Sequence, residues 1–240
     1  MIREDGRNYD QLRAVSFQAD FVEYPEGSVL VSFGKTRVLC NVTLEEGTPK
    51  WMAGKGRGWL TAEYAMLPRA THERNQRENM GPGARSQEIK RLIGRSLRMA
   101  VDLEQLGERT ITIDCDVLQA DGGTRTAAIS GGYVAVAIAL NRLIRNGELK
   151  PSVLCSPVAA ISVGIVQGQP LLDLCYREDV QADVDMNVIM NEKGELIEVQ
   201  ATGEHKGFSR AELDELLSLA DGGIQQIMQL QQHVLSNYTQ

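Results

Sequence analysis

The sequence has few cysteines, and their spacing is not that of a redox motif or a disulfide-rich scaffold. Its 240 residues contain four cysteines, and no two of them form a C-x-x-C pair. We predict that all four are buried free thiols, which suits a reducing cytoplasm. A fold without cross-links depends on its core, and a chain of this length can bury a sizeable one in one domain or two small ones. The four are Cys40, Cys115, Cys155 and Cys175.

Segments that direct a chain to a membrane are also lacking. The first ten residues are polar and charged, which argues against a signal peptide. No stretch approaches the roughly 20 consecutive apolar residues of a membrane span. We therefore expect a cytoplasmic protein that has no membrane partner.

Two motifs that would indicate other chemistries are incomplete. Residues 34–36 read Gly-Lys-Thr, as at the end of a nucleotide-binding loop, but the glycine needed five positions earlier is replaced by Val29. The three histidines have no metal-ligand spacing and no visible nucleophile partner. We therefore assign neither a nucleotide-binding loop nor a catalytic histidine.

The net charge of -7 conceals a strong segregation of charge along the chain. Residues 50–98 carry 11 basic and 4 acidic side chains, a local charge of +7. The other 14 basic and 28 acidic side chains give the rest of the chain a charge of -14. An acidic protein ordinarily avoids nucleic acid, but a basic segment of this size favours polyanion binding at one surface.

Apolar periodicity predicts the main elements of the first half. Residues 28–44 alternate as two strands joined at a turn, and residues 110–117 alternate strictly, with every second side chain apolar. A run rich in Ala, Ile, Val and Leu then predicts a helix that ends at Arg145, before Asn146-Gly147. Residues 47–84 are rich in Gly, Pro and Arg, so we expect loops there around a short strand near residues 60–66.

The segment between that strand and that helix, QADGGTRT over residues 119–126, is a candidate anion cradle. Glycines allow a ligand to approach the backbone closely, and the first amides of a helix have no intrahelical partners. Arg125 adds a permanent forked cation. The alternative interpretation is an ordinary Gly-Gly turn beside a solvated arginine.

A second basic residue, Arg85, lies at the start of another predicted helix. Apolar side chains recur at helical spacing from Gln87 onward, and Ser86 is suited to be the N-cap. Arg85 then has the same electrostatic setting as Arg125. The two guanidinium groups would bind one anion if the fold brings the helix starts together.

The second half repeats the order of strands first and helices after. Strands are predicted over residues 158–166, 171–175, 187–190 and 195–199. Ser209 and Glu212 form a capping box, and Asp221-Gly222-Gly223 is expected to break or kink the helix that follows. We therefore predict an α+β fold with two halves, residues 1–147 and 148–240.

Acidic and basic residues in two further segments suggest binding chemistry. Asp179 and Asp185 are six residues apart beside a predicted strand, so their carboxylates are candidate magnesium ligands, although spacing alone favours a solvated acidic loop. The arginine-rich loop over residues 68–77 is a candidate phosphate-binding segment, and a solvated charged loop is the alternative. Asp114 and Asp116 need no role beyond the polar face of a strand.

Four long segments, taken together, carry a family resemblance. They are GRGWLTAEYAMLPRATHERN from Gly56, EIKRLIGRSLRMAVDLEQLGERTITIDCDVLQADGGTRTAAISG from Glu88, DMNVIM from Asp185 and IEVQATGE from Ile197. In order and content they resemble the ribonuclease PH family of phosphate-dependent 3′ to 5′ exoribonucleases, relatives of polynucleotide phosphorylase and the exosome core. One departure is Gly-Ala-Arg-Ser at residues 83–86, where many members have Gly-Gly-Arg-Thr; the arginine is retained.

The resemblance implies two mixed-sheet halves of the βαβα type with packed helices, and roles for individual residues. The N-terminal half would carry the phosphate-binding loop, and the C-terminal half the metal-binding aspartates and the last helices. It implies that orthophosphate, the co-substrate, binds to Arg85, Gly123, Thr124 and Arg125. Asp179 and Asp185 would be the catalytic pair and would hold Mg²⁺ or another divalent ion such as Mn²⁺.

The resemblance further implies an RNA partner and an assembly. Arg69, Arg74 and Arg77 would hold the acceptor end of tRNA and contribute to subunit contacts in a homohexamer built as a trimer of dimers. The implied activity is phosphorolytic trimming of the 3′ ends of precursor tRNA, with rRNA as a further candidate substrate. A non-catalytic RNA-binding ring subunit and a hydrolytic nuclease are the alternatives.

Overall fold

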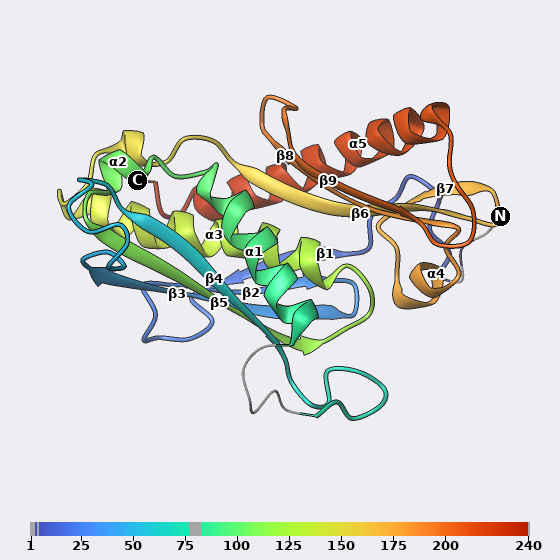
Figure 1. The fold of residues 1–240 in the computed structure, drawn as a ribbon, viewed down its shortest axis with the longest axis horizontal. Coiled ribbons are helices and arrows are strands. Elements are labelled where there is room, and N and C mark those ends of the chain that lie inside the picture. The colour runs from blue at the N-terminus through green and yellow to red at the C-terminus, as the bar shows by residue number, and fades with distance from the viewer. Residues whose placement is uncertain (1–2, 4, 77–82, 240) are drawn as a thin grey trace.

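The chain forms two β-sheets with helices packed between and beside them (Figure 1). The structure is a computed structural model, and it describes residue 3, residues 5–76 and residues 83–239. The first sheet has the strand order β1-β2-β3-β5-β4, and the second has the order β7-β6-β8-β9. The first sheet consists of β1 (Val15–Ala19), β2 (Gly27–Phe33), β3 (Thr36–Glu46), β4 (Trp59–Met66) and β5 (Arg109–Gln119). The second consists of β6 (Val158–Val166), β7 (Gln169–Leu172), β8 (Val184–Asn191) and β9 (Leu196–Gly203).

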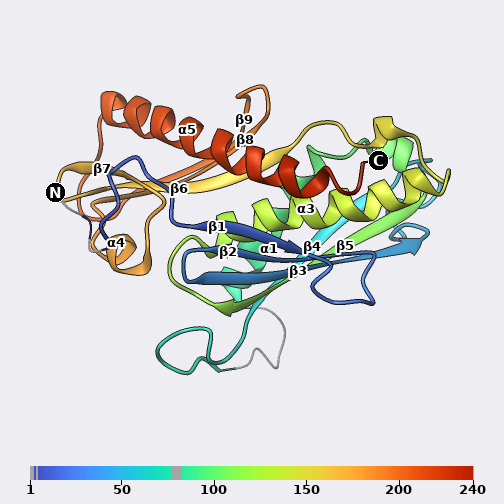
Figure 2. The same cartoon turned by 180° about the vertical axis from the view of Figure 1, so that it is seen from behind.

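Five α-helices and one short 3-10 helix complete the described part of the chain. They are α1 (Ala84–Arg98), α2 (Leu103–Leu106), α3 (Thr124–Arg145), η1 (Pro151–Val153), α4 (Tyr176–Val180) and α5 (Arg210–Leu235). Figure 1 shows α3 running between the first sheet and the second, and Figure 2 shows the same order from behind. The α+β class predicted from the sequence is confirmed. The division into residues 1–147 and 148–240 stays a prediction.

Strict alternation of apolar and polar side chains gives β5 one buried face and one partly exposed face. Ile111, Ile113, Cys115 and Val117 are buried, whereas the residues between them are partly exposed. The strand pairs antiparallel with β3 and parallel with β4, so it is covered on both edges. The carboxyl end of β5 leads directly into the glycine pair of the candidate anion cradle.

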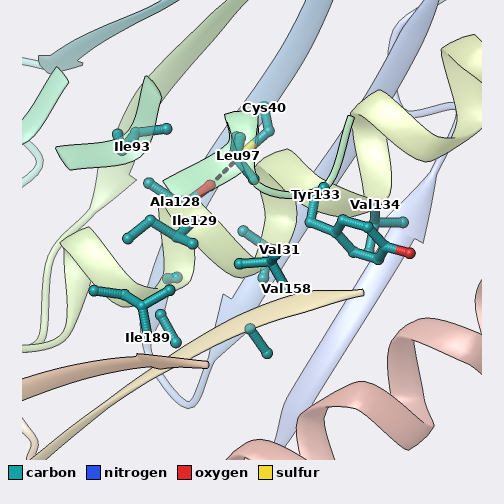
Figure 3. Close-up of a cluster of buried hydrophobic side chains, with 14 of the residues drawn as sticks. Val31, Cys40, Ile93, Leu97, Ala128, Ile129, Tyr133, Val134, Val158 and Ile189 are labelled. Atoms are coloured by element: carbon teal, nitrogen blue, oxygen red, sulfur yellow. Dashed lines mark hydrogen bonds between the residues drawn. The ribbon is translucent and has the colours of Figure 1, made fainter. Parts of the chain in front are cut away.

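The core is built around α3. Its buried side chains meet those of β2 and β3 on one side and of the second sheet on the other, as in the cluster of Figure 3. Val31 and Cys40 come from the first sheet, Ile129 from α3, and Val158 and Ile189 from the second sheet. Because both sheets share this cluster, the position of α3 is fixed from two directions.

One helix, α3, bears on the expectation that no stretch approaches a membrane span. By length and composition alone, this helix of 22 residues passes such a test, as the only described one that does. However, 83% of its apolar window is buried inside the protein. A helix that is hydrophobic on all sides also results when two sheets enclose it, which is the arrangement here.

Two local predictions are corrected. Gly222 and Gly223 do not break the last helix, because α5 continues unbroken through them to Leu235. Gly223 instead lets the helix approach β7, since an added Cβ would lie 2.7 Å from a methyl carbon of Leu172. The N-cap of α1 is Gly83 rather than Ser86, which is buried in the first turn.

The thiol prediction holds only in part. All four cysteines are free, and Cys40 and Cys115 are buried side by side in the first sheet. Cys155 is exposed and Cys175 is partly exposed, because both lie in connecting segments outside the strands. Neighbouring apolar residues predict burial within a strand. They do not predict the burial of a residue in a connection between elements.

The two adjacent glycines of α5 give a matched test of this packing. Gly223→Ala should lower the free energy of unfolding by about 1 to 3 kcal/mol, because the new methyl group meets the buried side chain of Leu172. Gly222→Ala has no atom within 4 Å to meet and should raise stability by up to about 1 kcal/mol through helix propensity. Urea unfolding of both variants measures the difference, and equal effects would contradict this account.

Candidate active site

The turn between β5 and α3 can be formed only by residues that accept a left-handed backbone. Gly122 has φ of 77°, and Gly123, the N-cap of α3, has φ of 65° and ψ of 29°. A Cβ on Gly122 would lie 2.6 Å from the carbonyl oxygen of Leu174, so the turn packs directly against the segment that leads into α4. The glycine pair therefore serves both conformation and close approach.

Side chains from the first sheet hold this turn in place. The hydroxyl of Thr36 donates to the carbonyl oxygen of Gly122 at 2.6 Å and accepts from the amide of Asp121 at 2.9 Å. At the first turn of α3, the hydroxyls of Tyr64 and Thr124 are 2.9 Å apart and both are buried. The cradle is therefore preorganised, with its helix amides pointing out of the N-terminus of α3.

Arg125 has a buried donor that no described residue satisfies. Its Nη2 donates to Glu88 at 3.1 Å, but its Nε is buried and has no hydrogen-bond acceptor among the described residues. An unsatisfied buried donor on a cation is costly unless an acceptor arrives from outside the chain. An oxyanion bound at the head of α3 would supply that acceptor.

The starts of α1 and α3 converge, as the interpretation of Arg85 and Arg125 required. Glu88, in the first turns of α1, forms an ion pair with Arg125 of α3, so the two helix starts adjoin. Arg85 is the second residue of α1, and its side chain is exposed. Burial raises the pKa of both Tyr64 and Asp179, and the charge of Arg85 opposes each rise, so its guanidinium lies near both groups.

The two candidate carboxylates face these arginines from the second half of the chain. Asp179 lies on α4 and Asp185 near the start of β8. Burial and, after it, the charge of Asp179 raise the pKa of Asp185 to about 6, against the opposing charge of Arg125. Burial likewise raises the pKa of Asp179, against the opposing charges of Arg125 and Arg85.

The chemistry of this pair fits a divalent cation. Burial raises the pKa of both carboxylates, and the charge of Asp179 adds to the rise at Asp185, so a cation beside the pair would stabilise their ionised forms. No group of three or more His, Cys, Asp and Glu side chains within the described ranges is arranged to hold a metal. An ion bound here would therefore have two protein carboxylates and several waters, which is how Mg²⁺ is commonly held.

One acidic residue of the site had no role in the sequence analysis. Glu204 follows β9, and its amide donates to the carbonyl oxygen of Asp183 at 2.9 Å. Its charge raises the pKa of both Asp179 and Asp185. Glu204 ends the IEVQATGE segment, but nothing in the spacing of a strand residue indicates that a turn will direct it toward carboxylates 19 and 25 positions earlier.

The arginine loop that follows β4 lies beside the cradle. The amide of Ala120, just after β5, donates to the carbonyl oxygen of Ala70 at 2.8 Å and so ties the base of the loop to the strand that leads into the cradle. Arg69 and Arg74 are exposed on this loop, which projects from the body of the protein in Figures 1 and 2. Arg77 lies outside the described residues.

Comparison with protein families matches both halves of the chain to one family. Residues 11–140 match the model described as 3′ exoribonuclease family, domain 1, and residues 156–223 match domain 2 of the same family. The chain therefore belongs to the 3′ exoribonuclease family.

Within this family the chain is similar over its length to proteins named ribonuclease PH. It is 56% identical to that of Crocosphaera subtropica over 234 residues, which cover 98% of each chain. It is 57% identical to that of Corynebacterium efficiens over 235 residues, 97% of this chain and 96% of the relative. The sequence resemblance to the ribonuclease PH family is thus confirmed.

Solved structures agree in fold. Rice Rrp46 matches with a TM-score of 0.78 at 20% identity, covering 97% of this chain and 100% of the other. A chain of the Archaeoglobus fulgidus exosome with RNA bound to the active site matches with a TM-score of 0.77 at 23% identity, covering 95% and 91%. At these identities the likeness concerns the fold alone.

The raised pKa of Asp185 makes a prediction about stability. The ordinary value is 3.8 and the folded value is about 6, so unfolding releases protons between these values and stability falls as pH rises through that window. Above it, the ionised carboxylate costs the folded state about 1 to 3 kcal/mol. Without divalent ions, Asp185→Asn should therefore raise the free energy of unfolding in urea at pH 7.5 by about that amount.

The control is a neighbouring aspartate that already has a partner. Asp183 lies 3.6 Å from Lys206, so Asp183→Asn should give no such gain. At pH 4 the Asp185→Asn variant should lose its advantage, since the wild-type carboxyl is then mostly protonated in the folded state. An Asp185→Asn variant that is less stable than wild type at pH 7.5 would refute the electrostatic account.

Proposed function

We propose that this protein is a phosphorolytic 3′ to 5′ exoribonuclease that trims the 3′ ends of precursor tRNA. Full-length relatives named ribonuclease PH support the activity. The single observation that carries the mechanism is that the cationic head of α3, with Arg125 and the adjoining Arg85, faces the carboxylates of Asp179 and Asp185. A cation-rich anion site opposite a cation-binding site suits two anionic reactants.

The nucleophile in this reaction is orthophosphate. We assign its binding to the amides near Gly123 and Thr124 at the N-terminus of α3, and to the guanidinium groups of Arg85 and Arg125. The unpaired Nε of Arg125 supports the assignment, because a phosphate oxygen would satisfy it. Positive charge around the nucleophile also offsets its repulsion from the RNA phosphate.

The opposite side of the site holds the RNA end. Asp179 and Asp185 would bind Mg²⁺, or Mn²⁺ in its place. When bound, such an ion neutralises charge that develops on the scissile phosphate and the leaving oxygen. The two carboxylates orient that end of the RNA relative to the phosphate held on α3, and Glu204 adds to the negative field that favours a cation here.

The bond changes follow from this placement. An oxygen of orthophosphate attacks the last internucleotide phosphorus, and the bond from that phosphorus to the 3′ oxygen of the preceding nucleotide breaks. The 3′ oxygen takes a proton, and a nucleoside 5′-diphosphate leaves the shortened RNA. Asp185 is the candidate donor of this proton. A bound cation would lower the pKa of Asp185 and so favour its ionised form, and we therefore assign it first as a metal ligand.

The exposed arginines of the loop after β4 are assigned to the RNA. Arg69 and Arg74 stand beside the cradle on a projecting segment, as phosphate-binding side chains should, and Arg77 is expected to extend this set. Because their contacts are to backbone phosphates, they suit the acceptor end of tRNA and also rRNA ends.

The alternatives are less well supported. A non-catalytic ring subunit would have no use for both halves of the site, yet one chain carries the cradle, both arginines and both carboxylates. A hydrolytic nuclease would need the metal side but not an anion pocket for a second phosphate. We further propose a cytoplasmic homohexamer, a trimer of dimers, in which neighbouring subunits extend the RNA track; sedimentation of the full chain tests it.

The products of the reaction distinguish phosphorolysis from hydrolysis. RNA with a precursor tRNA 3′ end, incubated with Mg²⁺ and phosphate, should release nucleoside 5′-diphosphates, and omitting phosphate should stop release. Chromatography of the mononucleotides measures both. Monophosphates formed without phosphate would refute phosphorolysis, and no release with phosphate would favour the non-catalytic alternative.

Two arginines of the same helix test the assignment of the phosphate site. Arg125→Ala removes the cation at the head of α3 and should raise the phosphate concentration for half-maximal rate by about 100-fold, as expected for the loss of a charged hydrogen-bonding partner. Arg142→Ala, near the other end of α3, breaks an exposed ion pair with Asp20 and should leave the phosphate concentration for half-maximal rate unchanged. Similar phosphate dependence for Arg125→Ala and wild type would reject the assigned role.

A further inference from the structure

A buried arginine near the N-terminus contacts both segments that carry the assigned ligands. The side chain of Arg13 is 5% exposed and lies just ahead of β1. Its Nη2 donates to Asp173 Oδ1 at 2.7 Å, and its Nε and backbone amide donate to Oδ2 at 3.0 and 2.8 Å. Asp173 follows β7 and is fully buried, so this forked ion pair is closed to solvent.

The same guanidinium group also holds the cradle. Nη1 of Arg13 donates to the carbonyl oxygen of Asp121 at 2.5 Å, and Nη2 donates to that of Gly122 at 3.5 Å. The fit is close, since a Cβ added to Gly123 would lie 3.1 Å from Nη2. One side chain thus joins the turn ahead of α3 to the segment ahead of α4.

Two more arginines fix the backbone of Asp173. This residue has φ of 56°, a left-handed conformation that costs a non-glycine residue about 1 to 3 kcal/mol and persists only where its surroundings impose it. Its carbonyl oxygen accepts from Arg3 Nη2 at 2.9 Å and from Arg7 Nη1 at 3.0 Å. We call Arg3, Arg7 and Arg13 the N-terminal clamp.

The clamp also holds α4, which has little else to hold it. This helix has five residues, and none of them is buried. Glu178 accepts from Nε and Nη2 of Arg3 at 2.7 and 2.6 Å and from the amide of Cys175 at 2.9 Å. The next residue is Asp179, so the position of this carboxylate depends on polar contacts with the N-terminal segment.

Stability alone does not explain such an arrangement. Taking charged groups out of water is expensive, and apolar side chains of similar size commonly stabilise a fold as well as a buried ion pair does. A planar guanidinium group, however, fixes direction as well as distance at each of its donors. Direction matters here because the two segments it joins must present an anion site and a cation site to each other.

We propose that Arg13, supported by Arg3 and Arg7, is a positioning residue that sets the phosphate-binding turn and the Asp179 helix relative to each other. It touches neither reactant. Loss of its fork therefore weakens orthophosphate binding and divalent-ion binding together, whereas a ligand of one sub-site affects mainly that sub-site. The inference rests on the proposed function for the identity of the two ligands.

Arg13→Lys keeps the charge and removes the fork, and binding measurements read both sub-sites without turnover. We expect the dissociation constants of orthophosphate, by calorimetry, and of Mn²⁺, by electron paramagnetic resonance, each to rise by about tenfold or more, as misplacement by about an ångström implies. Arg125→Lys should raise mainly the constant for orthophosphate. Arg142→Lys, a solvent-facing arginine paired with Asp20, should change neither constant.

Arg7→Gln provides a second variant if Arg13→Lys does not fold, because it removes the contacts of Arg7 to Asp173 and Glu178 and leaves the forked pair in place. It should shift both constants in the same direction by a smaller factor. A folded Arg13→Lys variant with both constants unchanged, or with only one of them raised, would overturn the proposal. Wild-type protein that releases no nucleoside diphosphates would instead overturn the proposed function, since the two binding constants are read independently of it.

Discussion

The enclosure of α3 between the two sheets is the constraint on which the site depends. A helix buried from two sides cannot shift along its axis without disturbing the packing of both sheets, because interiors are close-packed. Its N-terminus is therefore a fixed point, and the amides there keep a fixed direction. The residues that we assign to the anion site lie at this N-terminus or on α1 beside it, so the position of α3 determines where they lie.

Around this point the protein accepts electrostatic costs that a purely structural fold would avoid. Arg125 keeps a buried nitrogen without an acceptor, and Asp185 keeps a carboxyl whose ionisation is disfavoured by burial and by Asp179. The two groups carry charges of opposite sign, and they lie on facing sides of the site. An anion would relieve the first cost and a cation the second, so binding of both proposed ligands would be favoured by the relief of these costs.

The sequence predicts the individual strands and helices better than it predicts which of them contact one another. Period-two alternation located β5, and the Gly-Gly pair located the turn before α3, because both are local consequences of backbone geometry. The sequence does not predict that Glu88 lies beside Arg125, because this contact depends on how α1 packs beside α3. The spacing of Asp179 and Asp185 indicates candidate metal ligands and the family resemblance implies their catalytic role, but only the fold shows that the charge of Asp179 acts on Asp185.

Some features had no local signal at all. Gly223 looks like a helix breaker until the contact with Leu172 gives it a packing role, and that contact spans 51 positions. Cys155 sits among apolar residues but in a connection that remains exposed. Glu204 and the N-terminal clamp are similar cases, because polar residues near chain turns acquire partners only from distant segments.

The span of the clamp has a consequence for the order in which the protein is made. Arg13 and Asp173 are 160 positions apart, and Arg3 and Glu178 are 175 apart. A ribosome that has released only the first sheet and α3 has produced the anion cradle but neither the segment that closes it nor the carboxylates opposite. Since chains emerge from the N-terminus onward, a growing chain remains without a complete site until more than two thirds of it has been synthesised. A growing chain that lacks Asp179 and Asp185 therefore cannot carry out the chemistry proposed for the finished protein.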